Sequence, residues 1–160
     1  MEANVANPQT LTTKVVAPKT IIYHEGNTTL RQIHDYVNPI VASLIQEVQR
    51  RGFTTAGPME FIYLNPTGDL DKEFTLQIAQ PVLERKSVGP GFHIRETEAF
   101  QCVSHDYKGD VSQMHPAYEM LYQQIALNQL IPGTEVREVY KVWEHLTSVN
   151  NITEIQIGLA

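Results

Sequence analysis

The residues with the clearest chemical potential form the run Val136-Arg137-Glu138-Val139-Tyr140. If this run is a strand, Glu138 and Tyr140 project from one face and Val139 from the other. A carboxylate beside a tyrosine on the inner face of a sheet suits a cationic aromatic ligand. The acid supplies charge, and the ring supplies stacking and cation–π attraction of about 0.5–2 kcal/mol. We therefore expect Glu138 and Tyr140 to bind a ligand.

Two other interpretations of Glu138 stay open. On an outward face it is a solvated residue that pairs with Arg137 or Lys141. In a buried position it can act as a general acid or base, with Tyr140 as its hydrogen-bond partner. The sequence has no Gly-x-Ser-x-Gly motif and no glycine-rich phosphate loop. Glu138 is therefore the one catalytic candidate, and only if the protein is a hydrolase.

An internal repeat supplies the elements that position these residues. A strand, a glycine turn, a helix entered at a proline and two further strands occur twice in the same order. The first copy comprises 20–24, Gly26, Pro39, 60–64 and 74–82, and the second comprises 100–105, Gly109, Pro116, 136–140 and 152–159. In this alignment His24 corresponds to His105, and Tyr63 to Tyr140.

The first helix shows an apolar face of Ile33, Val37, Ile40, Val41, Leu44, Ile45 and Val48. Asn38 followed by Pro39 predicts its start, with an earlier turn from Thr29 as the alternative. Gly52 predicts its end. The sequence thus indicates an α+β fold: a duplicated β-α-β-β module whose curved antiparallel sheet carries two main helices and a central cleft. We expect a loose tail at 1–10 and one domain at 11–160, with repeat one at 11–82, a linker at 83–94 and repeat two at 95–160.

The same alignment predicts the wall of a binding site. It places Phe61 opposite Glu138, so that Phe61, Tyr63, Glu138 and Tyr140 line one inner face. Apolar walls with few polar groups are typical of small-molecule pockets. Three further aromatic residues complete the expected ligand-binding set: Trp143 at the mouth of the pocket, and Tyr36 and Tyr118 in the groove between the two helices.

Composition narrows the class of protein. The 160 residues are 42% hydrophobic and 19% charged, with a net charge of −6. No apolar run approaches the ~18 residues that cross a bilayer, and no Lys/Arg cluster is dense enough for a phosphate-binding patch. We expect no membrane partner and no direct nucleic-acid partner. The single cysteine, Cys102, favours a cytoplasmic location.

We expect no metal and no cofactor. His24 and His105 occupy matching repeat positions and could in principle share an ion. However, no Cys/His or His/carboxylate spacing typical of zinc is present, and both are expected to be strand-end residues.

The second half contains, in this order, the short motifs His105-Asp-Tyr-Lys-Gly109, Ala117-Tyr118, Glu138-Val-Tyr140 and Thr153-Glu-Ile155. Their order resembles that of the GyrI-like effector-binding domain, which occurs alone and as the ligand-sensing part of AraC-type and MerR-type multidrug regulators. Gly57-Pro58, Phe61-Ile-Tyr63 and Pro81-Val82 fit the same pattern in the first half. The resemblance spans Thr12 to Leu159.

This resemblance implies a duplicated β-α-β-β fold, related to that of the SOUL family, and a hydrophobic, often cationic ligand between the modules. The family's pocket glutamate maps to Glu138 and its neighbouring aromatic residue to Tyr140. We expect a stand-alone protein that senses or sequesters a small amphipathic or cationic aromatic molecule. The alternatives are a hydrolase that detoxifies cyclopropanoid-type molecules through Glu138, and a protein-interaction module. A homodimer or a separate regulator stays open as a protein partner.

Overall fold

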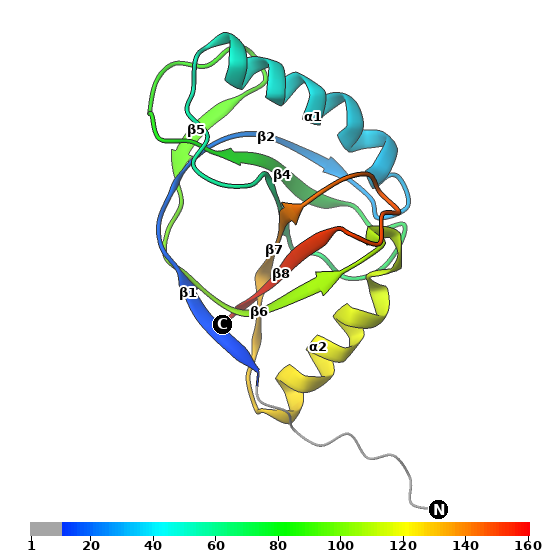
Figure 1. Ribbon diagram of the computed structural model, residues 1–160. Helices are drawn as coiled ribbons and strands as arrows, with labels where there is room; N and C mark the ends of the chain where they lie inside the picture. Colours follow the sequence, from blue (N-terminus) through cyan, green and yellow to red (C-terminus); the bar gives the residue numbers. More distant parts are fainter. Residues whose placement is uncertain (1–10) are drawn as a thin grey trace, which may run out of the picture.

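The computed structural model describes residues 11–160, so the tail expected at residues 1–10 lies outside the described part of the chain. Within residues 11–160 the helices are α1 (Ile33–Arg50), α2 (His115–Leu127) and a short 3-10 helix, η1 (Val111–Gln113) (Figure 1). The strands are β1 (Thr12–Val16), β2 (Thr20–Thr28), β3 (Glu60–Leu64), β4 (Phe74–Pro81), β5 (His93–Glu96), β6 (Phe100–Lys108), β7 (Pro132–Val142) and β8 (Ile152–Leu159).

All eight strands of residues 11–160 form one antiparallel sheet in the order β1-β6-β8-β7-β3-β4-β2-β5. The first module comprises β2, α1, β3 and β4, and the second comprises β6, α2, β7 and β8. The corresponding strands of the two modules occupy equivalent positions when the sheet order is read from its two opposite edges. The two copies of the β-α-β-β module therefore meet where β3 pairs with β7. The expected α+β fold with a duplicated module and a curved antiparallel sheet is confirmed.

The connections between strands force this sheet to curl. Residues 17–19 join β1 to β2, yet these strands are six positions apart in the sheet, about 29 Å if it were flat. The connection from Val16 to Thr20 spans at most about 14 Å. β5 and β6 are also six positions apart, and the three residues that connect them impose the same limit on the distance between these strands. Lys19 and Thr97 lie in these two connections and hydrogen-bond to each other, Thr97 N to Lys19 O at 2.8 Å.

The two faces of the curled sheet differ in what covers them. Both helices pack on one face, where the main core includes Leu44 and Val48 of α1, Leu121 and Ile125 of α2, and the inward residues of the strands. The opposite face has a smaller apolar cluster of Ile21, Ile62 and Ala79. It also holds buried charged and polar side chains, namely Glu60, Gln77, Arg137, Glu154 and Gln156.

Three local expectations are wrong. His24 and His105 are not at strand ends, because they lie in the interior of β2 and β6. Asn38 does not begin the first helix: α1 begins at Ile33 and runs through Pro39, so the alternative with an earlier turn is nearer, although Thr29 itself is not helical. Ile33 and Val37 are buried in the core, and this burial extends the helix by a turn and a half. Gly26 is not in a turn but inside β2, where a Cβ atom would lie 2.0 Å from the hydroxyl oxygen of Tyr36. The glycine therefore makes room for the Tyr36 side chain.

The edge strands β1 and β5 are absent from the expected pattern. Each lies in the sequence just before the first strand of one module, but each pairs with the first strand of the other: β1 with β6, and β5 with β2. β5 also begins inside the segment expected as a linker. The proposed division at residues 11–82, 83–94 and 95–160 stays a prediction.

The contribution of the strand connections to stability can be tested at the Lys19–Glu60 ion pair. Lys19 Nζ lies 2.6 Å from Oε2 of Glu60, whose side chain is fully buried. Removal of one partner of a buried ion pair costs about 3–5 kcal/mol, because the remaining charge is left uncompensated. We expect Lys19→Met to lower the free energy of unfolding by about 3 kcal/mol in urea denaturation.

The control is the double variant Lys19→Met with Glu60→Gln, which removes both charges. It should recover most of the lost stability. If the single and double variants are equally stable, the pair does not contribute as described.

Candidate functional site

Glu138 lies in the middle of β7, on the sheet face that carries the helices. It is 5% exposed, and its strand neighbours on the same face are Ile155 of β8 and Phe61 of β3. The structure thus places Phe61 directly opposite Glu138, as the repeat alignment predicts. The outward interpretation of Glu138 is wrong, because Arg137 bonds Glu135 and Lys141 bonds Asp106 and Glu154 instead.

Three tyrosine hydroxyls donate hydrogen bonds to the Glu138 carboxylate. The hydroxyls of Tyr63 on β3 and Tyr140 on β7 both donate to Oε1, at 2.8 and 2.7 Å. The hydroxyl of Tyr118 on α2 donates to Oε2 at 2.5 Å. Hydrogen bonds to a charged group contribute about 1.5–3 kcal/mol each. Tyr63, Tyr118, Tyr140 and Glu138 are called the Glu138 cluster below.

The environment keeps these hydroxyls protonated. Desolvation raises the pKa of Tyr63, Tyr118 and Tyr140 well above its ordinary value near 10, and the negative charge of Glu138 raises it further. Each hydroxyl therefore stays a donor at physiological pH. The Glu138 carboxyl is thus surrounded by three neutral donors.

Two aromatic rings pack against Tyr140 of the cluster. The rings of Phe61 and Tyr140 meet edge to face with centroids 4.9 Å apart, and Trp143 meets Tyr140 in the same way at 5.5 Å. Trp143 is 49% exposed, while Phe61, Tyr118 and Tyr140 are partly exposed. Partly exposed aromatic side chains therefore lie close to a buried carboxyl group.

Glu138 differs from the other buried glutamates of residues 11–160. Glu47 pairs with Arg50 and Arg51, Glu60 with Lys19, and Glu154 with Lys14 and Lys141. Within that same part of the chain, Glu138 has no Lys, Arg or His partner. A buried carboxylate without a cation is unusual, because buried charges are normally paired.

Tyr36 lies apart from the cluster. Its ring is near His24, with centroids 6.5 Å apart, and its hydroxyl lies over Gly26. Gly26 on β2 is separated from Tyr63 on β3 by Leu76 of β4, so Tyr36 is two strands away from the cluster. The structure brings six of the seven expected ligand-binding residues together and leaves Tyr36 outside.

Two neighbours of the cluster were not expected from the sequence. Phe74 packs on Tyr63 with ring centroids 5.5 Å apart. Thr153 of β8 lies opposite Tyr140, is fully buried, and has a hydroxyl oxygen with no hydrogen-bond partner within residues 11–160. The repeat alignment predicted strand register for β3 and β7 only. The register of β4 and β8 would have placed Phe74 and Thr153 near the cluster.

Neither helix of the described chain has the length and apolar composition needed to cross a membrane. Among residues 11–160, no three histidine, cysteine or acidic side chains gather as ligands for a metal ion.

Several solved structures share this fold. The C-terminal domain of EcmrR has a TM-score of 0.78 and 18% sequence identity, with 94% of this chain and 97% of that domain covered. In the EcmrR–DNA complex the chain spans 57% of the EcmrR chain. SAV2435 bound to tetraphenylphosphonium has a TM-score of 0.67 and 14% identity, with 95% and 94% covered. A hydrolase encoded by lin2189 from Listeria innocua has a TM-score of 0.60 and 11% identity, with 97% and 94% covered.

No curated protein matches the sequence. The family model described as the GyrI-like small molecule binding domain matches residues 11–160, the whole described chain. The match agrees with the duplicated module and with the sequence motifs around Glu138. The chain therefore belongs to the GyrI-like family of small-molecule binding domains.

Proposed function

We propose that this protein binds an amphipathic organic cation, with Glu138 as the counter-ion. The observation that supports this most strongly is the missing basic partner of Glu138. The other buried glutamates of residues 11–160 each have a lysine or arginine within 3.3 Å, and Glu138 has three neutral hydroxyls. A ligand cation would complete an ion pair that the protein leaves half-formed.

The surrounding rings favour a ligand that is both cationic and aromatic. Phe61, Tyr140 and Trp143 offer ring faces and edges beside the carboxylate. Cation–π attraction contributes about 0.5–1 kcal/mol at exposed rings and about 2 kcal/mol or more at desolvated ones. SAV2435, which shares the fold, was solved with tetraphenylphosphonium, a cation with four phenyl groups.

The position of Tyr118 suggests how a ligand reaches the carboxylate. Tyr63 and Tyr140 come from the central strands and share Oε1, whereas Tyr118 comes from α2 and alone occupies Oε2. Sheet strands hold their side chains more firmly than a helix that buries only Leu121, Gln124 and Ile125. We infer that the cation displaces the Tyr118 hydroxyl from Oε2, and that this opens the central cleft.

Binding is favoured over hydrolysis as the role of Glu138. The groups that hydrogen-bond to the Glu138 carboxylate are three tyrosine hydroxyls, two on Oε1 and one on Oε2. In the described chain, no serine, cysteine, histidine or second carboxylate hydrogen-bonds to the cluster. A general base also needs its substrate proton within hydrogen-bond reach.

The charge of Glu138 is tested by Glu138→Gln, which keeps the shape of the side chain. Loss of one partner of a buried charge pair costs about 2–5 kcal/mol, so tetraphenylphosphonium affinity should fall about 30-fold or more. Isothermal titration calorimetry measures the affinity directly.

The matched control is Glu119→Gln, because Glu119 lies on α2 and its side chain is 68% exposed. It changes the net charge equally and should leave the affinity within about twofold, since exposed charges contribute little. Equal affinity of wild type and Glu138→Gln would refute the counter-ion role.

Tyr118 is tested by Tyr118→Phe, which removes the competing hydroxyl and keeps the ring. Because the cation no longer displaces a hydrogen bond of about 1.5–3 kcal/mol, its affinity should rise about tenfold or more. Tyr140→Phe should not raise the affinity, because the bond from Tyr140 to Oε1 persists in the free and the bound protein.

Tyr122→Phe, one turn further along α2, serves as the second control and should behave as wild type. Lower affinity in Tyr118→Phe would contradict displacement and would make Tyr118 a ligand contact instead.

A further inference from the structure

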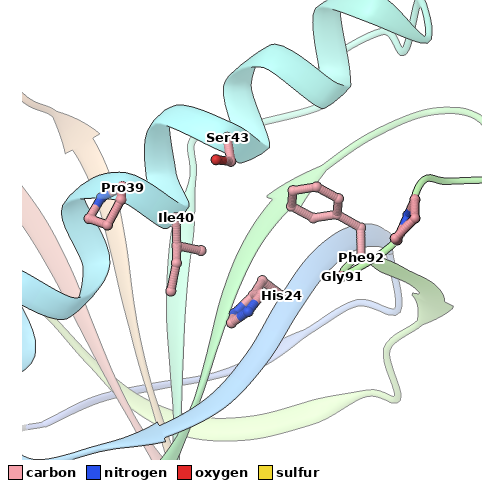
Figure 2. Close-up of a pocket in the computed structure, with 7 residues that line it drawn as sticks. His24, Pro39, Ile40, Ser43, Gly91 and Phe92 are labelled. Atoms are coloured by element: carbon pink, nitrogen blue, oxygen red, sulfur yellow. The ribbon is translucent and has the colours of Figure 1, made fainter.

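A pocket lies between the first half of α1 and the segment that precedes β5. It has a volume of about 300 Å³ and is shown in Figure 2. Its lining residues are His24, Pro39, Ile40, Ser43, Pro90, Gly91 and Phe92. Most of its wall is apolar, and its polar groups are the imidazole of His24 and the hydroxyl of Ser43. This composition is typical of a small-molecule pocket at the lower end of the usual size range.

The imidazole of His24 is partly exposed and lines the pocket. Its Nδ1 is buried and has no hydrogen-bond partner in the part of the chain that the structure describes. Burial lowers the pKa of His24, the nearby His93 lowers it further, and Glu25 opposes both. The ring is therefore neutral at pH 7, with one donor and one acceptor nitrogen.

The pocket continues along α1 into a second hollow of about 450 Å³. Ser43 and Phe92 line both hollows, and Gln46, Glu47 and Arg50 complete the second. Together they form one groove along α1, called the α1 groove below.

The end of the α1 groove is positively charged. Glu47 bonds Arg50 at 2.6 Å and Arg51 at 2.7 Å, so its single negative charge faces two positive ones. The Arg50 side chain is 69% exposed and retains N–H groups that Glu47 does not use. This charge is opposite to that of the Glu138 cluster.

The connection after β4 builds this groove. The backbone N–H of Gly89 donates to Oε2 of Glu47 at 2.6 Å, and Thr54 bonds Glu84 through both its N–H and its hydroxyl. Glu47 thus fixes the segment against α1. Phe92 is held beside Ser43 as a consequence (Figure 2).

The α1 groove is distinct from the Glu138 cluster. His24, Ile78, Phe61 and Glu138 lie in one row across β2, β4, β3 and β7. Three strand spacings separate His24 from Glu138, about 14 Å, and the fully buried Ile78 lies between them.

We propose that the α1 groove is a second ligand site, which binds a small planar aromatic anion. The ring lies between Phe92 and Ile40, a polar ring substituent would reach His24 or Ser43, and the acid group reaches Arg50. Ser43 and Arg50 are seven residues apart on α1, about 10 Å, which matches the length of a bicyclic aromatic acid. This site does not depend on the cation site at Glu138.

Three naphthalene probes test the proposal, since they share one ring system and differ in charge: 2-naphthoate, 2-naphthamide and 2-naphthylmethylammonium. Their affinities are measured by calorimetry on wild type, Ser43→Trp, Arg50→Gln and Glu138→Gln. Ser43 is exposed, so a tryptophan there fills the groove without disturbing the core. Circular dichroism checks that each variant is folded.

We expect naphthoate to bind more tightly than naphthamide. Its binding should be abolished in Ser43→Trp, weakened about fivefold or more in Arg50→Gln, and unchanged in Glu138→Gln. Binding of the ammonium probe should be unchanged in Ser43→Trp and lost in Glu138→Gln. The proposal is overturned if naphthoate does not bind, if folded Ser43→Trp binds it as wild type does, or if Glu138→Gln alone abolishes it. If wild type binds naphthoate but not the ammonium probe, the result contradicts the cation site and supports the α1 groove.

Discussion

The structure depends on one buried negative charge at the seam between two copies of a module. Glu138 lies on β7, next to β3, and it is held by hydroxyls from β3, β7 and α2. A carboxylate cannot remain in a low-dielectric interior without donors or a cation. The three tyrosines supply the donors and tie both modules and one helix to a single group. The closed site is therefore stable without a ligand, yet it lacks the positive charge that the other buried glutamates of residues 11–160 have.

The framework is symmetric and the site is not. The row across the sheet reads His105, Ile155, Glu138, Phe61, Ile78 and His24 from β6 to β2. Histidines match at its ends and isoleucines match inside them, so the two modules pack alike. Only the central pair differs, with a carboxylate on one side and a phenyl ring on the other. A symmetric sheet thus presents one carboxyl group beside an aromatic wall, and this arrangement supports the proposed ligand with a charged end and an apolar body.

Much of this arrangement follows from the sequence. Tyr63 and Tyr140 occupy equal places in the repeats, and that alignment correctly predicts that Phe61 faces Glu138. The third donor, Tyr118, was expected only in a groove between helices, because helix packing against a sheet is not encoded in local periodicity. The edge strands β1 and β5 escaped prediction for the same reason: each pairs with the other module, which local sequence does not reveal. Of the two starts considered for α1, the earlier one is nearer to the structure, because core burial of Ile33 and Val37 outweighs the local signal of Asn38 and Pro39.

The sign of the ligand charge is the central claim, and two ions of nearly the same shape test it most directly. Tetraphenylphosphonium and tetraphenylborate both carry four phenyl rings and have opposite charges. Their affinities can be compared by competition against a fluorescent cationic dye. The account predicts that the phosphonium ion binds at least about 100-fold more tightly, a difference of about 2.7 kcal/mol. Equal affinity, or tighter binding of the borate, would contradict the assignment of Glu138 as the counter-ion.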